Sequence, residues 1–204
     1  MKRFSNDDVK EIANIIKNDG IISVPTDTVY GLCTRIKSEV AYNKLAQIKH
    51  RPSQKSFPIM CNNISQIKEI AVVNENAEKI IKHFMPGPIT IILLKKSEVE
   101  NTINNAGLRE TNEVAFRLAP SQFLTDLIKE VGVPIFMTSA NISNEPVCVS
   151  PDEIEEKLQG LDGIVEGDTF YNKSSTMVDC TSTTIKIQRE GPISLEDILE
   201  VLKK

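Results

Sequence analysis

The sequence has no tryptophan, and aromatic residues make up only 5% of its 204 residues. Hydrophobic residues account for 40% and charged residues for 25%, as in an average globular protein. The core must therefore consist mainly of Ile, Leu and Val. No repeat, low-complexity tract or convincing linker divides the chain, so we expect one domain over residues 1–204.

Metal-binding, secretory and membrane-spanning patterns are also lacking. Cys33, Cys61, Cys148 and Cys180 form no C-x-x-C pair and are not grouped with the two histidines, so we expect no metal site built by the protein. Scattered cysteines fit reduced, partly buried thiols. The N-terminus lacks the apolar region of a secretory signal, and the longest apolar run, 89–94, is too short to span a bilayer. These absences predict a cytoplasmic protein without membrane contact.

The common nucleotide-binding motifs are absent as well. The sequence has neither the G-x-x-x-x-G-K-[ST] phosphate loop nor the G-x-G-x-x-G dinucleotide motif. It has no evident Ser/His/Asp set, because His50 lies in a basic segment and His83 near a predicted helix end. The net charge of −4 argues against a surface that binds phosphate everywhere, but it leaves room for a local basic pocket.

Apolar periodicity and capping residues predict a mixture of helices and strands. Helices are expected from the cap Ser5 or Asn6 to Gly20, over 39–50, 76–84 and 121–131, from the cap Ser150, and over 195–203. Strands are expected over 21–24, 56–61, 89–94, 114–118, 133–138, 163–166, 177–180 and 184–188. Because the two kinds of element do not alternate strictly, the pattern predicts one α/β domain with a twisted, mixed sheet flanked by helices.

Four polar clusters are candidates for a site, which α/β proteins usually build at strand ends and on the following loops. They are PTDTVYGL (25–32), the basic segment 49–55, TSANISN (138–144), and SSTMVD (174–179) with Arg189-Glu190-Gly191. Each cluster alone fits a purely structural role, as a capped turn, a solvated face or a strand end. Together they offer cations and hydroxyls without a nucleophile or an obvious base. That inventory suits nucleotidyl or phosphoryl transfer by positioning and charge stabilisation.

In order and spacing, these motifs resemble the YrdC-like family of threonylcarbamoyl-adenylate synthases. The resemblance rests on PTDTVYGL, Lys49-x-Arg51-Pro52 with Lys55, Pro86-Gly87-Pro88-Ile89-Thr90, Arg117, Thr138-Ser139-Ala140-Asn141-x-Ser143, Ser175-Thr176-x-Val178-Asp179 and Arg189-x-Gly191. It covers nearly the whole chain, and seven motifs in register are highly specific. It implies a YrdC-like α/β fold around a concave basic cavity, and we expect no extra C-terminal domain of the kind that some relatives carry.

The resemblance also implies a reaction. Such enzymes combine L-threonine, bicarbonate and ATP, the last with Mg²⁺, into threonylcarbamoyl-AMP and release pyrophosphate. Downstream tRNA threonylcarbamoyl-transfer proteins then modify the adenosine next to the anticodon. We expect at most weak direct tRNA binding.

The resemblance implies a role for each matching residue. The catalytic cations would be Lys49 and Arg51. Threonine would be bound by Thr28, Tyr30 (with its ring and hydroxyl), Arg117, Ser139, Ser175 and Thr176; for Arg117, a phosphate is an open alternative to the threonine carboxylate. ATP would be bound by Lys49, Arg51, Lys55, Thr138, Asn141, Ser143 and Arg189.

Three positions depart from the family pattern. Ser56 stands where Pro is usual, Ser121-Gln122 where His-Pro often follows the conserved Arg, and Asn144 where Gly usually ends the turn. Asn tolerates positive φ better than most residues, so we expect a left-handed conformation at Asn144. The departure at 121–122 affects the expected contacts with the threonine carboxylate near Pro120. None of the three departures removes a predicted cation.

Two other functions remain open from the residues. One is an RNA-binding module of the same fold without synthase activity, as in a related subgroup; it would need basic residues along a groove. The other is a carbamoyl-adenylate enzyme of the kind found in hydrogenase maturation, which would use carbamoyl phosphate in place of threonine and bicarbonate.

Overall fold

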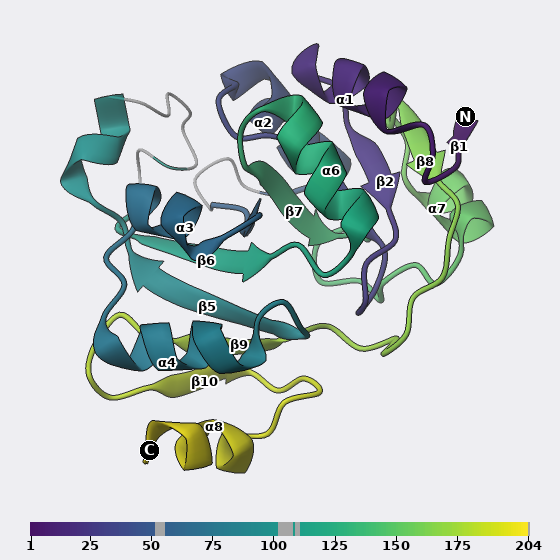
Figure 1. The fold of residues 1–204 in the computed structure, drawn as a ribbon. Helices are drawn as coiled ribbons and strands as arrows, with labels where there is room; N and C mark the ends of the chain where they lie inside the picture. Colours follow the sequence, from purple (N-terminus) through teal and green to yellow (C-terminus); the bar gives the residue numbers. More distant parts are fainter. Residues whose placement is uncertain (52–55, 102–107, 109–110, 204) are drawn as a thin grey trace.

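One mixed β-sheet of ten strands runs through the part of the chain that the computed structural model describes, residues 1–51, 56–101, 108 and 111–203 (Figure 1). Its strand order is β1-β8-β2-β3-β7-β4-β6-β5-β9-β10. The strands are β1 (Arg3–Phe4), β2 (Ile22–Val24), β3 (Gly31–Arg35), β4 (Ile59–Cys61), β5 (Ile89–Leu94), β6 (Glu113–Leu118), β7 (Ile135–Ser139), β8 (Gly163–Val165), β9 (Thr176–Asp179) and β10 (Lys186–Arg189). The helices are α1 (Val9–Lys17), α2 (Glu39–Ile48), α3 (Ile64–Ile70), α4 (Glu75–Phe84), α6 (Gln122–Val131), α7 (Pro151–Lys157), α8 (Leu195–Leu202) and a 3₁₀ turn, η1 (Ser97–Asn101).

Parallel and antiparallel pairs are mixed throughout this sheet. β8 pairs in parallel with both β1 and β2, β4 with β6, and β5 with β9. β3 runs antiparallel to β2 and to β7, and the pairs β4–β7, β5–β6 and β9–β10 are antiparallel too. Helices lie against the sheet, with α1 and α6 side by side and α4 beside α8 (Figure 1). The predicted α/β class, with a mixed sheet flanked by helices, is confirmed.

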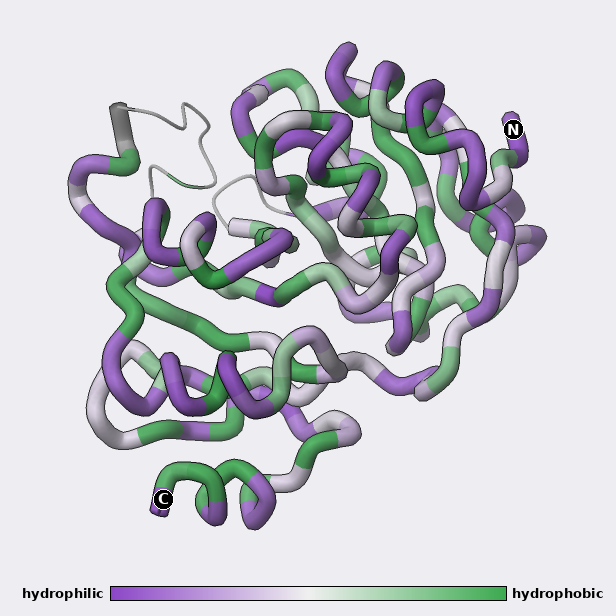
Figure 2. The backbone as a smooth tube through the Cα atoms, viewed as in Figure 1, coloured by the Kyte–Doolittle hydropathy of each residue, from purple (hydrophilic) through white to green (hydrophobic). Residues whose placement is uncertain are grey.

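Buried apolar side chains form two clusters. One joins α1 and α6, through residues such as Ile16 and Leu127, to side chains of β2, β3 and β7. The other includes Tyr42, Phe57 and Phe136, whose ring centroids lie 5.4 to 6.0 Å apart. Figure 2 shows hydrophobic residues along β2 and β5, whereas α1 and α4 alternate in hydropathy. All four cysteines are free and buried within these clusters, as reduced thiols would be.

Side-chain caps fix where most of the helices begin. The helices α2, α3, α4, α6, α7 and α8 each follow an Asn or Ser whose side chain accepts a backbone N–H of the first turn. The predicted start at Ser150 is confirmed, and so is the predicted start of the last helix at residue 195, which Ser194 caps. The predicted start of the first helix is wrong, because α1 begins after Asp8, whose carboxylate accepts hydrogen bonds from Ser5 instead. Within the described ranges, no helix is long and apolar enough to cross a membrane.

Four elements were not predicted from the sequence: β1, β3, α3 and the 3₁₀ turn η1. β1 is only two residues long and α3 only seven, too short for a clear periodicity. β3 follows the polar turn 25–30 directly, and its first four residues are all buried, so it shows no alternation. The strand predicted over 56–61 begins only at Ile59. β3 matters most for the site, because it carries that turn into the middle of the sheet between β2 and β7.

Candidate functional site

A cavity of about 530 Å³ lies where loops from distant parts of the chain meet the middle of the sheet. The loop before β3, the segment after α2, the end of β7 and the start of β9 contribute to its wall. Most of the predicted site residues line it: Thr28, Tyr30, Lys49, Arg51, Arg117, Thr138, Ser139, Asn141, Ser143, Ser175 and Arg189. Thr176 does not line it, and Lys55 lies outside the described residues.

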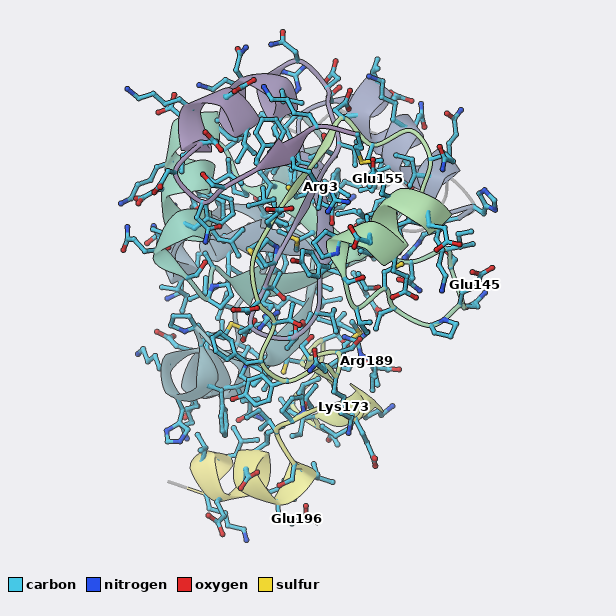
Figure 3. All side chains as sticks on the ribbon, turned by 90° about the vertical axis from the view of Figure 1, so that its right-hand side faces the viewer. Arg3, Glu145, Glu155, Lys173, Arg189 and Glu196 are labelled. Atoms are coloured by element: carbon cyan, nitrogen blue, oxygen red, sulfur yellow. The ribbon has the colours of Figure 1, made fainter. Side chains whose placement is uncertain are left out.

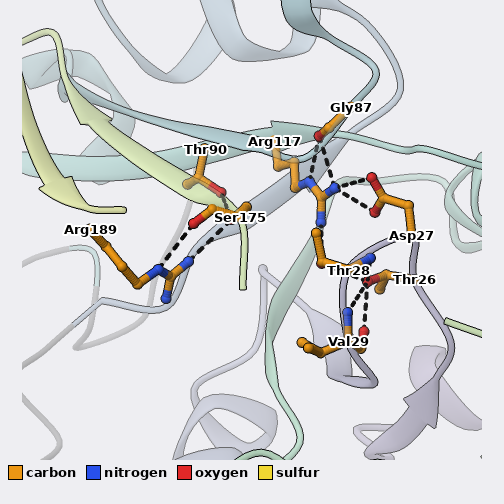
Figure 4. Close-up of polar contacts among 9 residues, drawn as sticks. All are labelled: Thr26, Asp27, Thr28, Val29, Gly87, Thr90, Arg117, Ser175 and Arg189. Carbon is orange, nitrogen blue, oxygen red and sulfur yellow. Dashed lines mark hydrogen bonds and ion pairs between the residues drawn. The ribbon is translucent and has the colours of Figure 1, made fainter. Parts of the chain in front are cut away.

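Thr26 sets the shape of the turn that follows β2. Its Oγ1 accepts hydrogen bonds from the backbone N–H groups of Thr28 (3.2 Å) and Val29 (3.3 Å), and it donates to the Val29 carbonyl at 2.6 Å (Figure 4). The Thr28 hydroxyl lies 3.0 Å from the same oxygen. Because the single proton of Thr26 goes to Val29, Thr28 must be the donor in that pair. The Thr28 hydroxyl can therefore act toward its other neighbours only as an acceptor.

Arg117 lies on β6, and its buried guanidinium contacts this turn. Its Nη2 contacts both carboxylate oxygens of Asp27, and its Nη1 donates to Thr28 Oγ1 at 3.0 Å. Its Nε and Nη2 also donate to the Gly87 carbonyl at 3.0 and 2.8 Å (Figure 4). Burial lowers the pKa of Arg117, and the neighbouring Asp27 carboxylate opposes that effect. The guanidinium thus joins three segments: the turn before β3, the turn before β5, and β6.

A second guanidinium, that of Arg189, is anchored on another part of the wall. Arg189 donates from Nε to the Ser175 carbonyl at 3.0 Å and from Nη2 to Ser175 Oγ at 3.1 Å. Ser175 Oγ lies 2.7 Å from Thr90 Oγ1 (Figure 4). The pKa of Arg189 is lowered first by burial and then by the charge of Arg117. Arg117 is buried, whereas Arg189 is exposed as a residue, and two guanidinium groups whose charges act on one another favour an anion between them.

Two predicted threonine-binding hydroxyls have other partners. The Tyr30 hydroxyl donates to the Gly167 carbonyl at 2.5 Å and accepts from the Gly167 N–H at 3.2 Å. The Thr176 hydroxyl donates to the Ile193 carbonyl at 2.7 Å and accepts from its N–H at 2.9 Å. Tyr30 therefore offers the cavity only its ring, and Thr176 fastens β9 to the segment before α8.

Lys49 lies just past the end of α2, with 3% of its surface exposed. Its Nζ donates to the Ser139 carbonyl at 2.6 Å, to the Asn141 carbonyl at 2.8 Å and to Asn141 Oδ1 at 3.1 Å. Burial, and secondarily the charge of Arg51, lower the pKa of Lys49 to about 8. The ammonium is therefore easier to deprotonate than that of a surface lysine.

Arg51 is held mainly by its flat face. Its guanidinium lies 4.8 Å from the centre of the Phe57 ring, and Nη2 donates to the Ser56 carbonyl at 2.8 Å. Among the residues that the structure describes, its buried Nε has no hydrogen-bond partner, and neither has the Ser143 hydroxyl of the same cavity wall. Buried polar atoms normally have a partner, so these two are available to a ligand. Burial lowers the pKa of Arg51.

Some residues of the site were not singled out from the sequence. Glu113 is the one carboxylate among the described lining residues, and Thr90 belongs to a motif to which no role was assigned. No role was predicted for Asp27, because its partner, Arg117, lies 90 positions away in the chain. The predicted left-handed conformation at Asn144 is confirmed, with φ of 70°. In the part of the chain that the structure describes, His, Cys, Asp and Glu side chains form no group of three or more that would hold a metal.

Comparisons with known proteins agree on the fold and on the family. The Sua5/YciO/YrdC family model, described as telomere recombination, matches residues 14–191. The threonylcarbamoyl-AMP synthase of Bacillus subtilis (strain 168) is 32% identical over 197 residues, which cover 95% of this chain and 56% of that protein. The chain thus spans little more than half the length of this relative.

Two solved structures are similar throughout the described fold. Sua5 of P. abyssi, complexed with L-threonine, superposes with a TM-score of 0.88 at 27% identity, covering 98% of this chain and 60% of the other. YciO of E. coli superposes with a TM-score of 0.83 at 23% identity, covering 97% of both chains. The family model spans the segments that build the cavity, from the turn after β2 to Arg189 on β10. This chain is therefore a member of the Sua5/YciO/YrdC family.

Proposed function

We propose that this protein synthesises threonylcarbamoyl-AMP from L-threonine, bicarbonate and ATP, releasing pyrophosphate. The observation that carries the proposal is the convergence of the four polar clusters in one cavity, where Arg51, Arg117 and Arg189 accompany the hydroxyls of Thr28 and Ser175. The cavity is large enough for small ligands, whose pockets typically measure about 300–1,000 Å³. The names of the relatives support the same reaction.

The cavity offers separate groups for the two substrates. Threonine would lie between Thr28, Arg117 and Ser175, against the ring of Tyr30. Its carboxylate would face the guanidinium group of Arg117. The triphosphate would lie toward Arg51, whose Nε has no partner in the described structure. Lys55, Thr138, Asn141 and Ser143 remain the further candidates for the nucleotide.

The reaction balances without a protein nucleophile. The threonine amine adds to the carbon of bicarbonate, and loss of water gives a carbamate. A carbamate oxygen then attacks the α-phosphorus of ATP, and the bond from that phosphorus to the bridging oxygen of pyrophosphate breaks. Negative charge builds up on the phosphate oxygens, where Arg51 and Arg189 would stabilise it in a site with little water.

Mg²⁺ would accompany ATP and neutralise part of the phosphate charge. The donor set fits such an ion only if the phosphates supply most of its ligands, because Glu113 is the only carboxylate among the described lining residues. This arrangement is the usual one for Mg²⁺, which keeps several waters and takes one or two protein carboxylates.

The product would be used by tRNA threonylcarbamoyl-transfer proteins. An acyl adenylate is a reactive mixed anhydride, so a second protein that accepts it directly would protect it from hydrolysis. We propose a cytoplasmic location for the protein, because tRNA would be the final acceptor of the threonylcarbamoyl group.

The first experiment is pyrophosphate release from ATP and bicarbonate, with and without L-threonine, and with serine and carbamoyl phosphate as alternatives. Release that requires both threonine and bicarbonate supports the proposal. Release driven by carbamoyl phosphate indicates the carbamoyl-adenylate activity instead. No threonine-dependent release refutes the synthase and favours the RNA-binding alternative, which RNA titration at increasing salt would then test.

A matched pair of variants tests the role of the cavity. Arg51→Met removes a cation that lines it, and we expect kcat to fall about 100-fold or more, as when one oxyanion donor is lost. Arg35→Met is the control, because Arg35 forms its ion pair with Asp19 away from the cavity lining. Equal activity of the two variants would contradict the assignment.

A further inference from the structure

Lys49 differs from the other cations of the cavity because its hydrogen bonds are already made. An ammonium group has three N–H donors and no acceptor. Those of Lys49 meet three acceptors at 2.6, 2.8 and 3.1 Å, all of them oxygens of Ser139 and Asn141. In this arrangement no donor of Lys49 remains for a ligand.

The backbone of Lys49 is joined to the same turn. Ser143 N–H donates to the Lys49 carbonyl at 2.9 Å. Within the turn, Ser139 Oγ donates to Asn141 Oδ1 at 2.6 Å, and the Asn141 amide donates to two backbone carbonyls at 2.8 and 2.7 Å. Asn141 is 8% exposed, so its polar atoms depend on these partners and not on water. Residues 139–143 and Lys49 thus form one connected network.

The two neighbouring arginines are different. Arg51 donates to the Ser56 carbonyl from Nη2, while its Nε has no partner within 1–51, 56–101, 108 and 111–203. Arg189 donates to Ser175 from Nε and Nη2. A guanidinium has five N–H donors, so both arginines keep donors for a ligand after these contacts. They also present the planar fork that matches a phosphate.

We propose that Lys49 is a positioning residue, which holds the 139–143 turn in its ligand-binding shape, and that Arg51 and Arg189 make the phosphate contacts. This inference rests on the proposed function for the identity of the ligand, and it revises the expectation that Lys49 itself holds the triphosphate. Its basis is geometric: the partly buried carbonyl of Ser139 and the buried carbonyl of Asn141 would lose a charged donor if Lys49 turned to a phosphate.

The direct test is NMR of the wild-type protein labelled with ¹⁵N. The ammonium signal of Lys49 is assigned by its absence in Lys49→Gln, and exposed Lys129 serves as the reference. We expect the Lys49 ammonium protons to exchange with water at least tenfold more slowly than those of Lys129. ATP added without threonine should shift the Arg51 Nε signal and leave the Lys49 signal nearly unmoved. Exchange as fast as that of Lys129, or a shift as large as that of Arg51, would overturn the proposal.

A double-mutant cycle tests the same inference through the reaction. If Lys49 acts through the turn, Lys49→Met and Asn141→Ala each lower kcat/KM at least tenfold, and the double variant is no worse than the worse single one. Lys49→Met and Arg51→Met should instead multiply, because they remove different contributions. The reverse pattern, with multiplication in the first pair and none in the second, assigns Lys49 to the phosphate.

The two proposals fail separately. If the wild-type protein shows no threonine-dependent pyrophosphate release, the proposed function fails, while proton exchange at Lys49 in the free protein still decides whether its ammonium is held by the turn. If release is normal but the ammonium exchanges freely, only the positioning role fails.

Discussion

Loss of Arg117 should destabilise the protein more than loss of any exposed cation. Arg117→Met removes the partner of the Asp27 carboxylate, whose side chain is 16% exposed, and leaves the Gly87 carbonyl with the Ile89 N–H as its remaining donor. Removing one partner of a buried ion pair costs about 3–5 kcal/mol, and partial exposure of Asp27 favours the lower end. The hydrogen bonds lost at the partly buried Gly87 carbonyl add about 1 kcal/mol. We therefore expect unfolding to become easier by about 4 kcal/mol.

Urea unfolding followed by circular dichroism measures this change, and calorimetry should show a Tm about 10 °C lower for a chain of this size. The control is Arg3→Met. Arg3 pairs with three carboxylates, those of Asp152, Glu155 and Glu166, but its side chain is 27% exposed. Figure 3 labels Arg3 and Glu155, which lie beside one another. An exposed pair of this kind contributes about 1 kcal/mol or less.

The double variant Asp27→Asn with Arg117→Met tests the pairing itself. If the two side chains stabilise each other, its cost is smaller than the sum of the single costs by at least about 1 kcal/mol. A strictly additive cost, or an Arg117→Met cost no larger than that of Arg3→Met, would refute the reasoning.

Three further predictions concern titration and close packing. Because the pKa of Lys49 is lowered to about 8, kcat/KM of the wild type should fall as pH rises from 7 to 9, while the profile of Lys49→Met stays flat; parallel profiles would contradict this. Burial raises the pKa of Cys33 and of Cys180 to about 12. In the folded protein these thiols therefore stay protonated at a pH where the thiols of the unfolded chain, with a pKa of about 8.5, have lost their protons. Stability in urea should therefore fall as pH rises from about 9 to 12, and less steeply in Cys33→Ala; an unchanged slope would count against it. Gly191→Ala would place a Cβ closer to the backbone nitrogen of Thr176 than two such atoms can approach. We therefore expect the free energy of unfolding in urea to fall by about 2 kcal/mol or more, and an unchanged midpoint would disprove the crowding.

The elements with strong local signals could be predicted from the sequence. The apolar run at β5 and the Ser–Pro start of α7 are examples, because a buried strand and a capped helix leave their mark on neighbouring residues. The residues of β3 carry no such local signal. Its position depends on pairing with β2 and β7 from distant parts of the chain, and a buried strand of five residues lacks alternation.

The members of the candidate site could be named from motifs, but their contacts could not. The motifs brought Thr28, Arg117 and Ser175 to attention, and the cavity contains all three. The hydroxyl of Tyr30 was expected to face threonine, yet it bonds to Gly167. Where a hydroxyl points depends on a partner 137 positions away, which no local pattern encodes.

The strand order has a consequence for how the protein folds. β2 pairs in parallel with β8, where Ile22 faces Gly163, and β5 pairs in parallel with β9, where Ile89 faces Thr176. Each pairing closes a long loop before its contacts form, and non-local pairing of this kind slows folding. During synthesis, the first half of the chain must therefore wait for β8 and β9 to leave the ribosome. The cavity should appear only in the last, cooperative step, so ligand binding would report complete folding.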